Sequence, residues 1–250
     1  MLDKKTPQEI EILKEGGAIL ASILEKLSKK VVVGVSGLEL DKLAESWIKE
    51  AGGRPAFKNY QGFPNTLCVS VNDTVVHGIP SSIPFQEGDL VGLDIGMEYK
   101  NFYTDMALTV GVGKISPQAQ ELLAVAKKSL SIGLNEIKPG KEIGDIGRAI
   151  EKFIKPYGYG IVRDLAGHGV GRAIHETPTV PNYNPGSKTA KMFAGLVLAV
   201  EPMIVLGGNH EVVTADNNWD IKAKDGTLTA HFEHSIAVTE DGYIILTTNK

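Results

Sequence analysis

The sequence predicts an α+β fold in which two similar halves face each other across one antiparallel sheet. Along the chain, two helices and a group of strands are followed by two more helices and more strands. The residue pattern of Gly34–Lys49 recurs with the same spacing in Gly140–Lys155, and His77–Pro80 is echoed by His175–Pro178. Because these matches are few, coincidence between two amphipathic helices is the alternative to a duplication. A site between two such halves would take residues from both.

The first half begins with two helices that the sequence defines at both ends. Thr6–Glu9 is a capping box with proline at the first helical position, and Lys29 suits the carboxyl end of that helix. Its apolar residues form one buried face: Ile10, Leu13, Ile19, Leu20, Ile23, Leu24 and Leu27. Ser36–Glu39 is a second capping box, and its helix is expected to run to Gly52.

The remaining elements follow the same order. Strand-like runs extend from about Thr66 to Val110. A third helix is expected to start at Ser116 and to end before Pro139, and a fourth to cover about Glu142–Lys155. Beyond it the pattern returns to strands and loops and ends in Thr227–Thr247.

Composition indicates an ordinary globular protein. The chain has 250 residues, 42% of them hydrophobic and 22% charged, which suits one large domain or two small ones. We expect a single domain over residues 1–250, with pseudo-duplicated halves of approximately 1–115 and 116–250. The net charge of −4 gives no reason to expect a nucleic-acid site or an anionic membrane as partner.

The compartment is indicated by three further features. Cys68 is the one cysteine, so no disulfide framework is possible and a reducing compartment is expected. The first ten residues have no apolar core and no small-residue cleavage site, unlike a signal peptide. No uncharged apolar run approaches the ~18 residues of a membrane span. A cytoplasmic location is expected.

Two aspartates stand out in the stretch Leu90–Val110, which reads as two strands joined by a polar turn around Glu98–Asn101. Pairing the strands symmetrically about that turn sets Asp94 opposite Asp105 on the same face, with Cβ atoms roughly 5 Å apart. Two such carboxylates repel each other, so a divalent cation or a shared proton is needed between them. The alternative is a different register with each aspartate solvated at a strand end, and both interpretations stay open.

Two glutamates and two histidines extend this donor set. Glu201 interrupts the apolar run Ala194–Leu206 and must be paired, protonated or metal-bound, with a buried salt bridge as the alternative. Glu233 repeats that situation near a second strand, where it shares a face with His231. His168 and His175 occur in or beside a glycine-rich loop, where a lone histidine is more often a surface residue.

Taken together, these residues point to hydrolase chemistry. Carboxylates combined with an imidazole suit a pair of divalent ions such as Mn, Fe, Co or Zn, whereas a structural zinc site normally uses cysteines. A two-metal site can activate water and polarise a carbonyl. No serine or cysteine nucleophile is indicated, because the chain has no G-x-S-x-G motif and Cys68 has no adjacent base in sequence.

At this point the sequence resembles the type I methionine aminopeptidases. Seven blocks carry the resemblance, in order and over essentially the whole chain: Val75–Pro80, Leu93–Gly96, Thr104–Ala107, Gly167–Arg172, His175–Pro178, Val200–Met203 and Phe232–Ser235. The resemblance implies the pita-bread fold, a duplicated α+β domain around a curved antiparallel sheet, in the short bacterial form.

The resemblance also implies roles for the metal-ligating residues. Asp94 would bind one metal in bidentate fashion, His168 would bind the other with Glu201 beside it, and Asp105 and Glu233 would bridge the two. The two divalent ions would be Co, Mn, Fe, Zn or Ni. A metal-bridging hydroxide would attack the carbonyl of the N-terminal methionine, and Glu201 would move its proton.

Substrate contacts follow from the same resemblance. His77 and His175 would hydrogen-bond the substrate and stabilise the developing charge. The methionine pocket would be lined by Tyr60, Phe63, Cys68 and Trp219, for which ordinary packing is the alternative. The sequence departs from the family at Val76, where cysteine is frequent, at Ile174, where an aromatic is common, and at His231, where glutamine is common.

The implied activity is removal of the initiator methionine from nascent chains whose second residue is small. A monomer that contacts the ribosome transiently is expected. One alternative is a proline-specific aminopeptidase or prolidase of the same fold, although such enzymes usually carry a separate N-terminal domain. Another is a non-catalytic binding module, which would typically have lost metal ligands.

Overall fold

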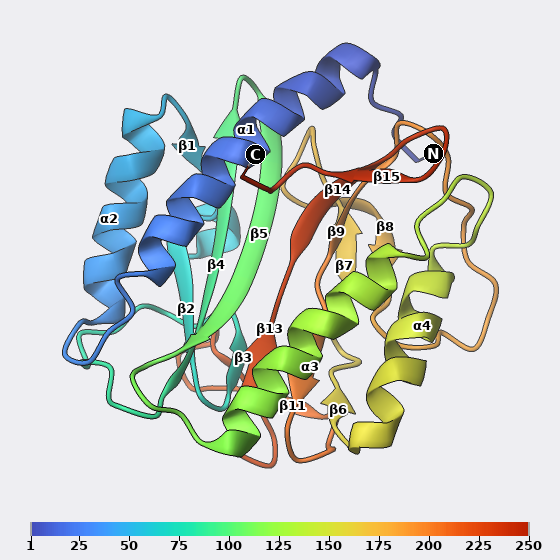
Figure 1. Ribbon diagram of the computed structural model, residues 1–250. Coiled ribbons are helices and arrows are strands. Elements are labelled where there is room, and N and C mark those ends of the chain that lie inside the picture. Colours follow the sequence, from blue (N-terminus) through green and yellow to red (C-terminus); the bar gives the residue numbers. More distant parts are fainter. Residues whose placement is uncertain (1, 250) are drawn as a thin grey trace.

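A computed structural model of the chain describes residues 2–249 (Figure 1). Its four α-helices are α1 (Pro7–Ser28), α2 (Gly37–Glu50), α3 (Pro117–Leu134) and α4 (Gly144–Ile154), and its short 3₁₀ helices are η1 (Tyr60–Gly62) and η2 (Lys155–Tyr157). The strands of the first half are β1 (Arg54–Pro55), β2 (Leu67–Val71), β3 (Thr74–Val76), β4 (Leu90–Tyr99) and β5 (Phe102–Gly111). Those of the second half are β6 (Gly160–Ile161), β7 (Gly167–Gly169), β8 (Glu176–Val180), β9 (Val197–Val200), β10 (Met203–Val205), β11 (Val212–Thr214), β12 (Ile221–Ala223), β13 (Thr229–His231), β14 (His234–Val238) and β15 (Tyr243–Ile245).

The helices form where their capping residues predict them. The side chains of Thr6 and Ser36 accept hydrogen bonds from the backbones of Glu9 and Glu39, and both capping boxes are complete. Ser116 caps α3 in the same way, with a proline in the first turn. The expected order of helices and strands is therefore confirmed. No helix within residues 2–249 is long and apolar enough to cross a membrane.

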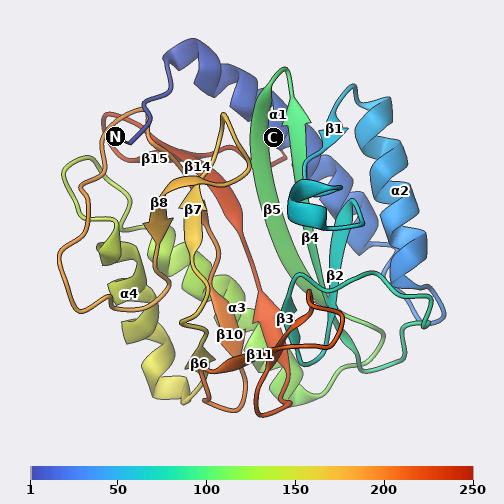
Figure 2. The same cartoon turned by 180° about the vertical axis from the view of Figure 1, so that it is seen from behind.

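The strands pair antiparallel, as the sequence predicts, and within residues 2–249 their hydrogen bonds group them into four sheets. The sheet of the first half holds β1, β4, β2 and β5, and the largest sheet of the second half runs β15-β14-β9-β7-β8. Figures 1 and 2 show the α-helices on one side of these strands, with η1 and several loops on the opposite side. Each half has its own apolar core between its helices and its strands.

The two halves meet along β5 and the β13–β14 segment, where side-chain hydroxyls take part in the pairing. The Thr109 hydroxyl accepts from the His231 amide and donates to the His231 carbonyl, both at 2.9 Å. The Ser235 hydroxyl accepts from the Asp105 amide at 2.9 Å and donates to its carbonyl at 2.8 Å. One direct bond, from the Glu233 amide to the Ala107 carbonyl, lies between them. Inserted hydroxyls therefore keep this seam from forming a regular ladder.

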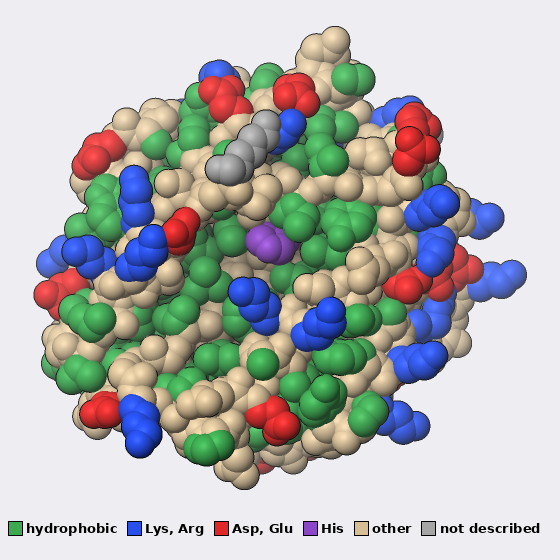
Figure 3. All heavy atoms as spheres, in the orientation of Figure 1, with side chains coloured by type: hydrophobic (Ala, Val, Ile, Leu, Met, Phe, Trp, Pro, Cys, Tyr) green, Lys and Arg blue, Asp and Glu red, His purple; other side chains and the backbone are tan. Residues whose placement is uncertain are grey.

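On the face drawn in Figure 3, charges of both signs are spread over the surface. Lysine and arginine side chains gather towards the edge at the right of that view, over α4 and its neighbouring loops, with acidic side chains among them.

Candidate metal centre

Every side chain that the sequence assigned to the site lines one cavity of about 110 Å³. The predicted members are Tyr60, Phe63, Cys68, His77, Asp94, Asp105, His168, His175, Glu201, Trp219 and Glu233. Two further lining residues, Phe57 and Gln61, were not predicted. Both flank Tyr60 in the loop before β2, so their nearness to a predicted pocket residue is the signal that could have indicated them.

The register expected for Asp94 and Asp105 is wrong, although the shared face is right. Asp94 in β4 lies opposite Ala107, and Asp105 in β5 lies opposite Gly96. The turn is shorter than expected, because Tyr99 already pairs with Phe102. The actual register differs by two residues, which keeps both carboxylates on one face as diagonal neighbours. The alternative of two solvated strand-end residues is therefore also wrong.

The four carboxylates converge from separate elements. Glu201 directly follows β9, Glu233 lies between β13 and β14, and single oxygens of Asp94, Asp105 and Glu233 lie within 4.8 Å of one another. Among the described residues, no lysine or arginine forms an ion pair with any of the four. The buried salt bridge considered for Glu201 is therefore not formed.

Burial without a counter-charge disfavours ionisation of the whole cluster. Burial raises the pKa of Asp94 to about 7. The pKa values of Asp105, Glu201 and Glu233 rise well above their usual range through burial first and neighbouring carboxylates second. Buried oxygens of Asp94, Asp105 and Glu233 have no hydrogen-bond partner. Such a cluster requires bound protons or bound cations.

His168 adds an imidazole nitrogen to this cluster. Its Nδ1 lies 2.8 Å from the Gly169 carbonyl oxygen. Because a carbonyl only accepts, Nδ1 carries the ring hydrogen when the imidazole is neutral. Burial lowers the pKa of His168 to about 4, so the ring is neutral at pH 7. Its Nε2 therefore directs a lone pair at carboxylate oxygens, 3.4 Å from Glu201 and 3.8 Å from Asp105. A cation between them, or a proton held on one of the carboxyls, resolves this opposition; the anchoring of the imidazole on a backbone carbonyl is the usual arrangement of a metal ligand.

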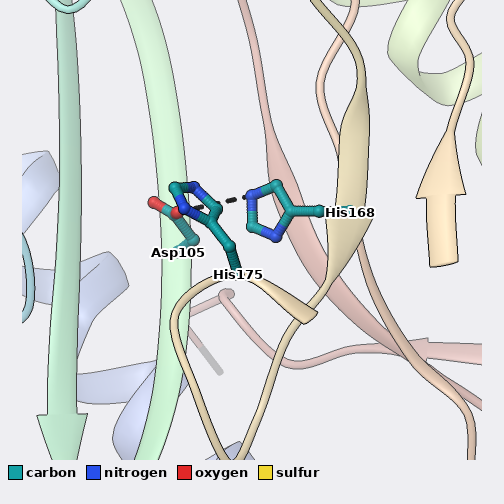
Figure 4. Close-up of side chains that lie close together, drawn as sticks. All are labelled: Asp105, His168 and His175. Carbon is teal, nitrogen blue, oxygen red and sulfur yellow. Dashed lines mark ion pairs between the residues drawn. The ribbon is translucent and has the colours of Figure 1, made fainter. Parts of the chain in front are cut away.

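His175 and His77 border the cluster without belonging to a strand. The His175 ring contacts the His168 ring edge-on at 4.3 Å between centroids, and its Nδ1 lies 3.1 Å from the Tyr60 hydroxyl. Figure 4 shows the His175 ring beside His168 and Asp105. His77 follows β3 in a left-handed backbone conformation, with φ of 58°. Partial removal from water lowers the pKa of both His77 and His175, so both rings are neutral at pH 7.

An aromatic pocket adjoins the carboxylates. Phe63 and Trp219 meet edge to face, with centroids 5.1 Å apart. Cys68 pairs with Asp94 across β2 and β4, which sets its thiol at the junction between the pocket and the cluster. Burial raises the pKa of the Cys68 thiol well above its usual range. The thiol is therefore a packing group and a poor nucleophile.

His231, one of the departures from the family pattern, lies next to Glu201 and Glu233. Its side chain is buried, with Nε2 3.7 Å from a Glu201 oxygen and 4.0 Å from a Glu233 oxygen. This nitrogen has no hydrogen-bond partner. Burial lowers the pKa of His231 to about 3, so it adds no positive charge to balance the carboxylates.

The antiparallel α+β fold and a buried carboxylate–imidazole cluster beside an aromatic pocket define a metal-dependent hydrolase. The model of metallopeptidase family M24 matches residues 11–240. Methionine aminopeptidase 1 of Bacillus subtilis is 43% identical over 247 residues, which cover 99% of each chain. The solved methionine aminopeptidase of Thermotoga maritima superposes with a TM-score of 0.96 at 39% identity and covers 100% of both chains. The chain belongs to the methionine aminopeptidases of family M24, and its fold is the pita-bread fold.

A prolidase from Pyrococcus furiosus shares the fold. It superposes with a TM-score of 0.81 at 24% identity, and this chain covers 66% of its length. That likeness concerns architecture alone. The full-length similarity to methionine aminopeptidases disfavours the proline-specific alternative.

Proposed function

We propose that this protein removes the N-terminal methionine from peptides and nascent chains with a small second residue. The observation that carries the proposal is the single cavity in which an aromatic, thiol-lined pocket meets a carboxylate cluster without counter-charge. The names of the full-length relatives support the same activity.

The proposed metal ligands are Asp94, Asp105, His168, Glu201 and Glu233. Glu233 belongs both to the group with Asp94 and Asp105 and to the group with His168 and Glu201. Asp105 likewise belongs to the group with Asp94 and Glu233 and to a group with His168 and His175, and these overlaps support two ions that would share a set of donors. Bound divalent ions would supply acidified water and a polarised substrate carbonyl. The donor set fits Co, Mn, Fe, Zn or Ni, and availability would select among them.

The chain's own residues would handle protons and hydrogen bonds. Glu201 is the proposed proton carrier, because its carboxylate lines the cavity beside the other proposed ligands and lies 3.4 Å from Nε2 of His168. When the Tyr60 hydroxyl donates to Nδ1 of His175, the other ring nitrogen carries a hydrogen that it can donate to the substrate. His77 is the proposed second donor. Neutral donors of this kind stabilise negative charge that develops on the substrate oxygen.

The pocket of Tyr60, Phe63, Cys68 and Trp219 would hold the methionine side chain. Aromatic edges and faces contact a thioether favourably, and the unbranched side chain adapts to an irregular cavity. Phe57 and Gln61 complete the wall.

The proposal extends to the protein's setting. Nascent chains as substrates imply a cytoplasmic enzyme that contacts the ribosome transiently. We further propose a monomer whose residues 1–250 form one catalytic domain with pseudo-duplicated halves.

Release of free methionine from Met-Ala-Ser tests the function, with Met-Leu-Ser and Ala-Pro-Ser as comparators. The assay runs in metal-depleted buffer and again after addition of Mn or Co. Metal-dependent cleavage of Met-Ala-Ser alone is the expected result. Cleavage of Ala-Pro-Ser instead would assign a proline-specific activity. A folded, metal-loaded sample that cleaves none of the three would favour the binding module.

A further inference from the structure

We propose that Lys5 is a positioning residue for His175, acting from the N-terminal segment across 171 positions of sequence through Glu176. The inference rests on the proposed function, in which His175 donates to the substrate. Its basis is a buried ion pair that joins the start of the chain to the loop carrying His175.

The Lys5 side chain lies inside the protein, which is unusual for a lysine. Only 1% of it is exposed, and its Nζ lies 2.5 Å from a Glu176 oxygen and 3.0 Å from an oxygen of the more exposed Asp3. The Lys5 amide donates to the Gly195 carbonyl, so its backbone is held as well. A Cβ on Gly171 would lie 2.5 Å from Lys5 Cε, and one on Gly195 would lie 2.7 Å from the Lys5 carbonyl oxygen. Two glycines therefore leave the space that Lys5 occupies.

Glu176 transmits this contact to the loop between β7 and β8. One carboxylate oxygen receives the Lys5 ammonium. The other accepts from the amides of Arg172 and Ala173, so a single side chain closes the bend that leads to His175. Removal of the ammonium leaves the Glu176 carboxylate with backbone donors on one oxygen only. A largely buried carboxylate in that situation turns towards water and releases the bend.

The flanking ion pairs do not replace this contact. Arg172 reaches Asp3 at 2.9 Å and Glu9 at 2.8 Å, but about half of the arginine side chain is exposed. Exposed pairs of this kind contribute little. In this group of linked ion pairs, Lys5 has the most deeply buried side chain.

His175 depends on this loop because its own anchoring is sparse. The residue is exposed, and its ring has one hydrogen-bond partner, Tyr60, among the described residues. The adjoining Ile174 is buried against Gly96. The direction of the imidazole is therefore set by the backbone between Arg172 and Glu176. A shift of about 1 Å in a donor of this kind costs up to about a hundredfold in rate.

The test compares Lys5→Met with Lys141→Met, because Lys141 forms a 2.5 Å ion pair with Glu136 far from the cavity. Kinetics on Met-Ala-Ser, metal content and thermal unfolding are measured for both. Lys5→Met is expected to lower kcat by about tenfold to a hundredfold with KM changed less than about twofold and metal retained. Lys141→Met is expected to match the wild type. A Lys5→Met protein that keeps kcat within about twofold overturns the inference.

A double-mutant cycle separates positioning from general destabilisation. If Lys5 acts through His175, Lys5→Met causes no further loss of kcat in a His175→Ala background. An equal loss in both backgrounds contradicts the inference. Should Lys5→Met fail to fold, Glu176→Gln serves instead, because its amide oxygen can still accept from Arg172 and Ala173. It is expected to give the same pattern.

A readout independent of turnover keeps this inference distinct from the proposed function. The ring NMR signals of His175, assigned by their absence in His175→Ala, are followed in metal-free protein. They are expected to shift in Lys5→Met and to stay unchanged in Lys141→Met. If the wild type releases no methionine, the proposed function fails while these signals still decide the role of Lys5. Unchanged signals in Lys5→Met would refute it.

Discussion

Asp94→Asn is expected to stabilise the metal-free protein at neutral pH, although it removes a proposed metal ligand. Burial raises the pKa of Asp94 to about 7, and a hydrogen bond with Asp105 opposes the rise in part. The asparagine is nearly isosteric and cannot ionise. Without a cation, the buried carboxyl of Asp94 therefore destabilises the folded wild type at neutral pH. The variant lacks this destabilisation.

The magnitude follows from the difference between the folded and unfolded pKa values of Asp94. The folded value of about 7 exceeds the usual 3.8 by roughly 3 units, which correspond to about 4 kcal/mol. In this window the folded state holds a proton that the unfolded state has released, so the free energy of unfolding falls as pH rises. The stability that protonated Asp94 contributes to the folded state is fully present below its unfolded pKa. It is lost as pH rises through its folded pKa.

Buried histidines make the free energy of unfolding rise with pH, which is opposite to the effect of Asp94. The pH dependence of wild-type stability alone therefore does not isolate the effect of Asp94. Burial lowers the pKa of His168 to about 4 and that of His231 to about 3. The unfolded state gains their protons as pH falls below about 6.5, which destabilises the fold on the acid side. Both proteins share this behaviour, and it cancels in their difference.

Urea unfolding of chelator-dialysed protein measures that difference. Asp94→Asn is expected to exceed the wild type by about 1 kcal/mol at pH 4.5 and by about 4 kcal/mol at pH 7.5. Adding Mn should reverse the order at pH 7.5, because the wild type binds the ion more tightly and gains more stability. A metal-free variant that is no more stable than the wild type at pH 7.5 would refute the reasoning.

Three further substitutions probe the catalytic groups and the seam. Glu201→Gln should lower kcat by about 10²- to 10³-fold with an unchanged far-UV circular dichroism spectrum, and wild-type turnover would remove Glu201 from its proposed role. His175→Ala should lower kcat by about tenfold or more with metal content intact; metal loss, measured by atomic absorption, would instead make it a ligand. Thr109→Val should cost about 2–3 kcal/mol in urea unfolding, because it leaves the His231 amide and carbonyl unpaired, whereas Thr109→Ser should cost far less.

The helices were predictable because the signals that define them are local. In the capping boxes at Thr6 and Ser36, each partner lies three residues from the cap, so the sequence window contains the whole interaction. The carboxylates were recognisable for a related reason. A charged residue inside an apolar run, such as Glu201, signals a special environment wherever the chain folds.

The register of β4 and β5 was not predictable from the same stretch. The turn consists of Lys100 and Asn101, both with positive φ. Two-residue turns of this hand are usually marked by glycine, which is absent here, so the polar run Glu98–Asn101 does not reveal its centre. Moving the centre of the turn by one residue, from between Tyr99 and Lys100 to between Lys100 and Asn101, changes the partner of Asp94 by two residues. Because side chains alternate between the two faces of a strand, a shift of two residues still places Asp94 and Asp105 on the same face.

The Lys5 network was hidden for a different reason. A lysine in a polar N-terminal run is ordinarily a solvated residue, and its partner Glu176 lies 171 positions further along the chain. Nothing within a short window distinguishes it from Lys4. Only the close approach of Gly171 and Gly195 makes room for Lys5, and that approach is a property of the assembled structure.

The seam links assembly of the fold to assembly of the site. The Ser235 hydroxyl holds both backbone groups of Asp105, and the Glu233 amide donates to Ala107, two residues further along β5. The carboxylates of Asp105 and Glu233, both proposed metal ligands, thus come from opposite halves, and the hydrogen bonds that join the halves fix their separation. Neither half alone can present the cluster. The repulsion among the carboxylates in turn acts across this seam, so a cation that binds all of them favours closure of the two halves.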